Sequence, residues 1–382
     1  MNIELLNGDC LVLLEKIDDN SIDSIITDPP YEIGFMGKKW DNSGIAYNIE
    51  LWKECLRVLK PGGYLLSFSS TRTYHRMAVA IEDAGFEIRD MIEYVYGTGF
   101  PKSLDVGKAI DKLQGKARKM KGGNFLVHEE REETDEIELT KGTSAWEGFG
   151  TALKPSHEPI CMARKPLSEK NVAENCLKWN TGAINIQDCR IGEESIKQLT
   201  DVKSFQTWRE QDGRTPKDME NKELSYKTGR FPANLILDNT DEVKECFPYT
   251  ISGGGNKSNK SDVYGQSQVP KTIDNTNWES NSGSATRFFK TIIYEIKPSK
   301  KEKGHHNNHP TVKPIKLMEY LILMVTPENG IVLDPFLGSG TTGVAAINMN
   351  KHFIGMELNN DYLNIAQIRI DEVLKHKSEE LF

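Results

Sequence analysis

The sequence predicts an α/β fold with a mostly parallel sheet, and three observations support it. In residues 1–101 and 291–382, apolar segments of strand length alternate with segments whose apolar residues recur at helical spacing. A glycine-rich turn, "LGSGTTG", joins one of these strands to a helix. Between the two regions the alternation stops. We therefore expect one α/β domain built from both ends of the chain, with the middle inserted.

The N-terminal region predicts strands that alternate with amphipathic helices. The expected strands are 21–30, 64–70 and 86–97, and the expected helices are 48–63 and 72–85. Helix 48–63 is predicted to end at its Gly-Gly pair, because glycine commonly closes helices.

The middle of the chain is predicted to hold three segments of different character. Segment 102–153 is a charged excursion, with a Lys/Arg-rich part followed by an acidic run. Segment 154–166 is expected to return to the sheet as a strand. Segment 167–290 is rich in Asn, Ser, Gly and Lys, so we expect long loops, with ordered pieces at 182–191 and 229–238.

The C-terminal region resumes the alternation of helix and strand. The expected elements are a helix within 311–330, a strand at 330–336, a glycine-rich turn and helix at 337–350, a strand at 352–359 and a last helix at 361–375.

Composition indicates an intracellular protein. The formal net charge is −8, which argues against a whole surface devoted to nucleic acid but allows a local patch. The cysteines form no CxxC pair, so neither a zinc site nor a disulfide framework is indicated. No apolar run has membrane-spanning length, and the N-terminus lacks a signal-peptide layout. We expect a cytoplasmic location.

The glycine-rich turn predicts a site for an adenosine cofactor. Gly338, Gly340 and Gly343 form a GxGxxG between strand and helix, and Glu357 follows on the next strand, where an acid binds ribose hydroxyls. This pattern alone fits a nicotinamide dinucleotide equally well. Asp334 before the turn, however, suits a ligand that carries positive charge better than a pyrophosphate.

The stretch "SIITDPPYEIGF" ends a strand with an unusual tetrapeptide, Asp28, Pro29, Pro30 and Tyr31. Two prolines stop both helix and sheet pairing and leave a rigid extended backbone. The Asp28 carboxylate and the Pro29 carbonyl can accept the two hydrogens of an exocyclic amine, while Tyr31 stacks on a heterocycle. These groups would make the amine nitrogen a nucleophile.

Together, DPPY, "DPFLGSGTT" and "HPTVKP" at 309–314 resemble the S-adenosylmethionine-dependent amino-DNA methyltransferases. Their order, catalytic motif first and cofactor turn last, resembles the β group of that family. The resemblance covers residues 1 to about 100 and about 305 to 370. It implies a Rossmann-like methyltransferase fold with a circularly permuted motif order. It also implies that 94–103 and 152–166 form a hairpin that closes the sheet.

The resemblance assigns residues to two roles. The catalytic residues would be Asp28, Pro29, Pro30 and Tyr31. The cofactor-binding residues would be Asp9, Cys10, Asp28, His309, Thr311, Lys313, Asp334, Phe336, Gly338, Ser339, Gly340, Thr341, Thr342 and Glu357.

The implied reaction is methyl transfer from S-adenosylmethionine to adenine N6 in double-stranded DNA, with the base flipped into the site. Asp rather than Asn or Ser at position 28 favours adenine, and cytosine N4 is the alternative. No metal is required. Segment 167–290 would recognise the target. A homodimer and a cognate restriction endonuclease of a restriction–modification system are possible partners.

Several alternatives stay open. Asp9 either contacts the cofactor or caps the following helix. Loop 34–41 either faces DNA, with Lys38 and Lys39 on phosphates, or is solvated with Trp40 in the core. The basic part of 102–121 is either a solvated face or a phosphate-binding one; its candidate residues are Lys102, Lys116, Arg118 and Lys119. A dehydrogenase and a non-catalytic DNA-binding module are the competing functions.

Overall fold

The computed structural model describes residues 1–34, 39–97, 99, 103–115, 144–198, 225–252, 281–292 and 312–379. The chain divides into two compact units, Met1–Gly97 with His157–Phe382, and Thr98–Ser156. The first unit thus contains both ends of the chain, as the sequence predicts for its α/β domain.

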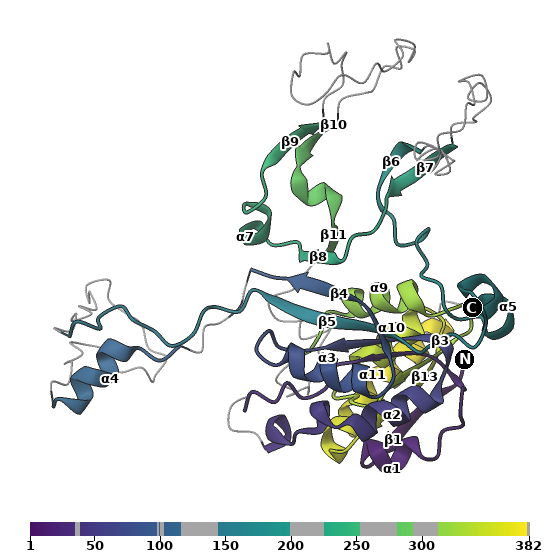
Figure 1. The fold of residues 1–382 in the computed structure, drawn as a ribbon, viewed down its shortest axis with the longest axis horizontal. Helices are drawn as coiled ribbons and strands as arrows, with labels where there is room; N and C mark the ends of the chain where they lie inside the picture. Colours follow the sequence, from purple (N-terminus) through teal and green to yellow (C-terminus); the bar gives the residue numbers. More distant parts are fainter. Residues whose placement is uncertain are drawn as a thin grey trace, which may run out of the picture. The chain divides into compact units, whose positions relative to one another are not determined.

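A nine-stranded sheet organises the larger unit, in the order β1-β13-β12-β2-β3-β5-β4-β8-β11 (Figure 1). Every neighbouring pair is parallel except those that β5 makes with β3 and β4. Its strands are β1 (Ile3–Asn7), β2 (Ile22–Thr27), β3 (Leu59–Phe68), β4 (Glu87–Val95), β5 (His157–Arg164), β8 (Leu235–Asp238), β11 (Lys290–Ile292), β12 (Ile331–Asp334) and β13 (His352–Glu357).

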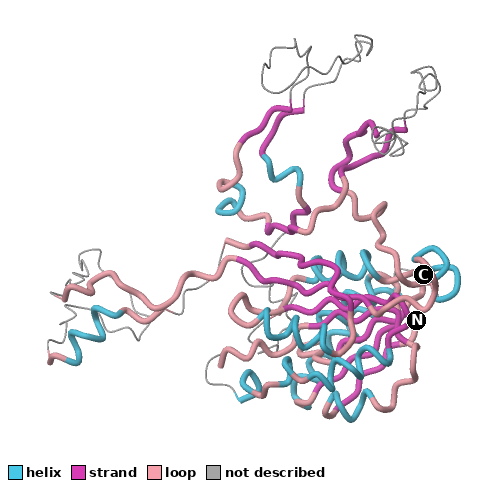
Figure 2. Tube along the Cα trace, viewed as in Figure 1, coloured by secondary structure: helices cyan, strands magenta, loops and turns pink. Residues whose placement is uncertain are grey.

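Helices cover both faces of this sheet (Figure 2). One core cluster joins the sheet to α9, α10 and α11, and the other joins it to α1, α2 and α3. Strand β2 is buried along its whole length, although Asp23, Ser24 and Thr27 interrupt its apolar residues. The helices of this unit are α1 (Cys10–Leu14), α2 (Ile49–Val58), α3 (Tyr74–Asp83), α5 (Val172–Trp179), α7 (Asp241–Lys244), α9 (Ile315–Val325), α10 (Thr341–Asn348) and α11 (Asn360–Glu379).

The sheet has a topological switch point between β12 and β2. These strands are parallel neighbours, with Val332 opposite Ser24 and Leu333 opposite Ile25. From β2 the chain continues to β3 on one side, and from β12 it continues to β13 on the other. Loops that diverge in this way leave a crevice at the carboxyl ends of the strands, where ligands bind in open α/β sheets. The predicted α/β fold is confirmed.

The predicted hairpin is present with shifted limits, but it does not close the sheet, because β8 and β11 continue the sheet beyond β4. Strands β4 and β5 pair antiparallel from Glu87 opposite Arg164 to Val95 opposite His157. In the sequence, the smaller unit, Thr98–Ser156, follows the end of β4 and precedes β5. Within that smaller unit, α4 (Val106–Leu113) begins at Asp105, whose side chain accepts from the Lys108 backbone N–H.

The prediction that Gly62 and Gly63 close a helix is wrong. Helix α2 ends at Val58, and β3 begins at the next residue, Leu59. The glycines form an irregularity in β3, where the pairing with β2 shifts between Ile22 and Ser24. Gly62 has φ of +82°, and a Cβ there would lie 2.5 Å from Nδ2 of Asn175. Close approach to the segment around α5 therefore explains the glycine.

Segment 167–290 carries more regular structure than its composition predicts. It supplies α5, η5 (Ala285–Phe288) and β8, which lies between β4 and β11 in the main sheet. It also supplies two antiparallel strand pairs, β6 (Ile191–Gln198) with β7 (Ser225–Arg230), and β9 (Tyr249–Ser252) with β10 (Asn281–Ser284). Asn171 caps α5 through Glu174 N–H, and Asn180 ends it in a left-handed conformation.

No helix in the described part of the chain has the length and apolar character needed to cross a membrane.

Candidate active site at the ends of β2 and β12

Asp334, at the end of β12, joins the two strand ends that border the crevice. Its Oδ1 accepts from Thr27 Oγ1 at 2.6 Å and from Phe336 N–H at 3.0 Å, and its Oδ2 accepts from Thr342 Oγ1 at 2.6 Å. Burial raises the pKa of Asp334 to about 6, against the opposing effect of these hydrogen bonds. Asp334 therefore fastens the DPPY strand to the glycine-rich turn, and its predicted ligand contact stays a prediction.

The glycine-rich turn has the backbone that its sequence predicts. Gly338 and Gly340 have φ of +55° and +85°, values that favour glycine. Gly343 lies in α10, where a Cβ would be 2.7 Å from Ile370 and 2.8 Å from Phe353. The turn thus leads the chain from β12 into a helix packed tightly on the sheet and on α11. Phe336, Ser339, Thr341 and Thr342 belong to this turn and to the start of α10.

Glu357, the predicted ribose-binding acid, ends β13 beside this turn. Its Oε2 accepts from Gly338 N–H at 2.8 Å and its Oε1 from Asn359 N–H at 2.8 Å. Burial raises its pKa, while those backbone hydrogen bonds oppose the shift. Backbone pairing of β1 with β13 places Asn7 opposite Glu357, and Gly8 N–H donates to the Glu357 carbonyl at 3.0 Å.

Asp9 and Cys10 follow directly, so they lie next to Glu357. Asp9 is exposed and caps α1, because its Oδ1 accepts from Leu11 N–H at 2.9 Å. The capping alternative is therefore present, and contact with a cofactor stays a prediction. Cys10 is buried, which raises the pKa of its thiol to about 12. A neutral, unreactive thiol suits packing rather than chemistry.

A charged cluster surrounds the DPPY tetrapeptide. The Lys313 Nζ lies 2.9 Å from Asp28 Oδ2, 3.1 Å from Glu158 Oε2 and 2.8 Å from the Tyr31 hydroxyl. The same ammonium lies 5.0 Å from the centroid of the Phe68 ring. Burial opposes the charge on Lys313, but the carboxylates of Asp28 and Glu158 outweigh it and raise its pKa.

One acceptor in this cluster has no protein partner. Asp28 Oδ1 is buried and accepts no hydrogen bond from any described residue, although Oδ2 binds Lys313. Buried polar atoms are nearly always paired, so an unpaired one at a crevice indicates a place for a ligand donor. Burial and the charges of Asp28 and Glu158 raise the pKa of Tyr31, which keeps its hydroxyl neutral.

Asp41 holds the end of the tetrapeptide, although no role was predicted for it from the sequence. Its Oδ1 accepts from the backbone N–H groups of Tyr31 at 2.8 Å and Glu32 at 3.0 Å. Glu32 has φ of +56°, and its carboxylate accepts from Gly44 N–H at 2.8 Å. The backbone after DPPY is therefore fixed by two acids in the chain that follows.

Glu158 and Phe68 were also missed by the sequence analysis. Glu158 precedes the apolar part of β5, and Phe68 ends β3 as an ordinary buried residue. Nothing in the local sequence pattern around Glu158 indicates that its side chain meets Lys313. Only the antiparallel return of β5 beside β3 brings them together.

Several predicted residues lie outside the described part of the chain. These are His309, Thr311, Lys38, Lys102, Lys116, Arg118 and Lys119, as well as the side chains of Lys39 and Trp40.

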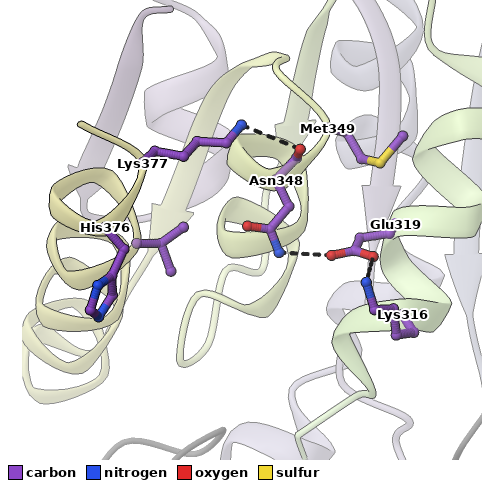
Figure 3. A pocket seen from close by; sticks show the side chains of 7 residues that line it. Lys316, Glu319, Asn348, Met349, His376 and Lys377 are labelled. Atoms are coloured by element: carbon purple, nitrogen blue, oxygen red, sulfur yellow. Dashed lines mark hydrogen bonds and ion pairs between the residues drawn. The ribbon is translucent and has the colours of Figure 1, made fainter. Parts of the chain in front are cut away.

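A separate cavity of about 370 Å³ lies among α9, α10 and α11 (Figure 3). Glu319 accepts there from Lys316 Nζ and Asn348 Nδ2, each at 2.7 Å. Asn348 ends α10, whose first residue follows the glycine-rich turn, so the cavity lies at the opposite end of that helix. It contains none of the predicted site residues.

The crevice residues fit S-adenosylmethionine. In the turn at 338–340, Gly338 and Gly340 expose backbone without side chains, and the eight-residue helix α10 begins directly after it. Asp28 Oδ1, which has no partner among the described residues, is an acceptor suited to an amine donor. The Thr27–Asp334 hydrogen bond makes the two parts contiguous.

Comparison with known proteins agrees with this geometry. The family model described as DNA methylase, of the N6/N4 methyltransferase type, matches residues 22–368. The type II methyltransferase M.HindIII of Haemophilus influenzae is 25% identical over 96% of this chain and 94% of its own. DNA adenine methyltransferase YhdJ of Escherichia coli is 43% identical over 20% of this chain and 26% of its own.

Among solved structures, the PvuII DNA methyltransferase, described as cytosine-N4-specific, matches with a TM-score of 0.46 and 14% identity. The match covers 98% of this chain and 91% of that one. Since the family model spans most of the 382 residues, the chain belongs to the N6/N4 DNA methylase family and is an S-adenosylmethionine-dependent DNA methyltransferase.

Proposed function

We propose that the chain methylates adenine N6 at a specific site in double-stranded DNA. The observation that carries the proposal is the buried Asp28 Oδ1, to which no described residue donates a hydrogen bond; Lys313 links the other oxygen of Asp28 to the Tyr31 hydroxyl. An exocyclic amine offers two hydrogens, and Asp28 Oδ1 with the Pro29 carbonyl would accept them. The ring of Tyr31 would stack on the flipped base, whose release from the duplex costs about a few kcal/mol.

The reaction is a direct displacement. The amine nitrogen attacks the sulfonium methyl carbon, the carbon–sulfur bond breaks toward sulfur, and the nitrogen releases one proton to solvent. Asp28 localises the nitrogen lone pair and fixes the amine on the line of attack, so the chain contributes mainly positioning. The charged Lys313 has no free pair with which to take the proton.

We infer that the glycine-rich turn binds the methionine end of the cofactor and that Asp9, Cys10 and Glu357 lie along its adenosine. Pairing of β1 with β13 supports this, because it brings the N-terminal segment and Glu357 to one edge of the sheet. His309, Thr311 and Lys313 would complete the methionine end.

We assign target recognition to segment 167–290. Two arginines there flank one aromatic ring: the Arg287 guanidinium lies 4.3 Å, and that of Arg230 5.1 Å, from the Phe288 centroid. Arginine and an aromatic ring on a surface suit nucleic acid, through phosphate contact and stacking. Replacing Arg230 with alanine should weaken DNA binding and lower its salt dependence; unchanged binding would remove this cluster from the interface.

The experiment that tests the reaction is long-read sequencing, with modification detection, of DNA from a methylation-deficient bacterial host that expresses the chain. Adenine modified at one recurrent motif supports the proposal. Modified cytosine would support the same methyl transfer with cytosine N4 as the target in place of adenine N6. Expression of Asp28→Ala should leave the same DNA unmodified while the purified variant still binds S-adenosylmethionine, and full activity in that variant would contradict the assigned role.

A cytoplasmic location, a cognate restriction endonuclease and a homodimer complete the proposal, since bacterial DNA and its restriction enzymes share one compartment. Light scattering of the purified protein tests the dimer. A cognate endonuclease should cleave DNA at the discovered motif, and methylation of that motif should block the cleavage. A digestion assay on methylated and unmethylated DNA tests this pairing.

A further inference from the structure

We propose that Glu158 is a positioning residue for methyl transfer, acting through Lys313 to keep one oxygen of Asp28 free for the target amine. This proposal rests on the proposed function and adds a residue to its site. Glu158 reaches the cluster from β5, a strand apart from both the DPPY loop and the glycine-rich turn.

The donors of the Lys313 ammonium group are all occupied by three neighbouring acceptors. A lysine ammonium has three N–H donors and no acceptor. Three acceptors surround Lys313 Nζ within 3.1 Å: Asp28 Oδ2, Glu158 Oε2 and the Tyr31 hydroxyl. Each donor therefore has one partner, and the ammonium has no donor left for Asp28 Oδ1. Among the described residues, none donates a hydrogen bond to that oxygen.

Charge and burial give Glu158 its influence over this arrangement. The side chain of Lys313 is 11% exposed, and those of Asp28 and Glu158 are 23% and 22% exposed. In such surroundings charges interact more strongly than in water, so the ammonium settles between the two carboxylates. Without Glu158, Lys313 would be drawn to Asp28 alone. It would then bridge both Asp28 oxygens and compete with the amine of the base.

Glu158 itself is held by the β4–β5 hairpin rather than by flexible chain. It lies opposite Tyr94 in the register, and the next residue pair joins Val95 to His157. A neighbouring contact on the same hairpin offers a matched control, because His157 Nε2 lies 3.2 Å from Glu93 Oε2 and the contacts of Lys313 described above include neither residue.

The test is a double-mutant cycle with Glu158→Gln and Lys313→Met, measured as kcat on duplex DNA that carries the discovered motif. We expect Glu158→Gln to lower kcat about 10- to 100-fold, the scale of a misplaced reacting group, with little change in S-adenosylmethionine affinity. In the Lys313→Met background the same substitution should change kcat less than about twofold, because coupled residues are not additive. Glu93→Gln should leave kcat unchanged.

An equal loss from Glu158→Gln in both backgrounds, or no loss in the wild-type background, overturns the proposal. Should Lys313→Met fail to fold, Glu158→Asp takes its place: keeping the charge should retain more activity than Gln, and an equal loss overturns the proposal. A wild-type protein that methylates no DNA contradicts the proposed function, and the inference falls with it.

Discussion

At the residue scale, the site depends on two aspartates, Asp28 and Asp334, that differ in what their oxygens bind. Asp334 has both oxygens occupied by hydroxyl and backbone donors, whereas Asp28 has one oxygen on Lys313 and one without a partner. The first arrangement holds two strand ends together, and the second leaves an acceptor for substrate. Identical side chains thus support structure in one place and chemistry in the other.

The raised pKa of Asp334 predicts how stability depends on pH. Because burial raises this pKa from 3.8 to about 6, the folded protein binds this proton more tightly than the unfolded chain. The stabilisation is therefore complete at low pH and is lost as the pH rises through about 6.

Asp334→Asn removes this dependence. Between pH 4 and pH 7 we expect the free energy of unfolding of the wild type to fall by about 2 kcal/mol relative to the variant. Urea unfolding of both proteins between pH 4 and pH 7 measures the difference in their free energies of unfolding. Titrating groups present in both proteins, such as Glu357, cancel in this difference. A difference that is constant with pH would contradict the prediction.

At the element scale, the turn before α10 admits only glycine at position 340. Gly340 has φ of +85°, and a Cβ there would lie 2.8 Å from the Cβ of Ala366 on α11. We expect Gly340→Ala to lower the free energy of unfolding by about 2 to 5 kcal/mol. The left-handed backbone accounts for about 1 to 2 kcal/mol of this loss and overpacking for about 1 to 3 kcal/mol. Affinity for S-adenosylmethionine should fall with it, measured by calorimetry.

Gly44→Ala is the matched control for this prediction. Gly44 has φ of +76°, but a Cβ there would have nothing within 4 Å. The Gly44→Ala variant should therefore lose only the part of the free energy of unfolding that comes from the left-handed backbone. Equal loss of stability in the two variants would mean that contact with α11 does not set the residue at 340.

The elements also show what could be predicted from sequence. The DPPY loop and the glycine-rich turn were recognisable because local backbone chemistry dictates their residues, and both lie where expected. Glu158 and Asp41 were not recognisable, because their roles depend on partners supplied by the fold: Glu158 meets Lys313 at a separation of 155 positions, through the β5 return. Gly62 was misread because a glycine pair after a helix has two explanations, and only packing against Asn175 distinguishes them.

At the scale of the whole molecule, the division into two units makes one of them removable. Strands β4 and β5 meet at Val95 and His157, which are register partners, so their ends are already adjacent without the chain between them. The larger unit keeps its sheet and both helical layers in residues 1–97 and 157–382. Its stability should therefore not depend on Thr98–Ser156.

We predict that a variant in which Gly97 is joined to His157 through an inserted Asn-Gly turn folds and binds S-adenosylmethionine with wild-type affinity. If the basic part of 102–121 contacts phosphates, the same variant loses affinity for duplex DNA, and the slope of log affinity against log salt becomes smaller. Calorimetry with the cofactor and a salt series with DNA separate the two effects. Lost cofactor binding would show that the smaller unit supports the site, and an unchanged slope would exclude Lys102, Lys116, Arg118 and Lys119 from phosphate contact.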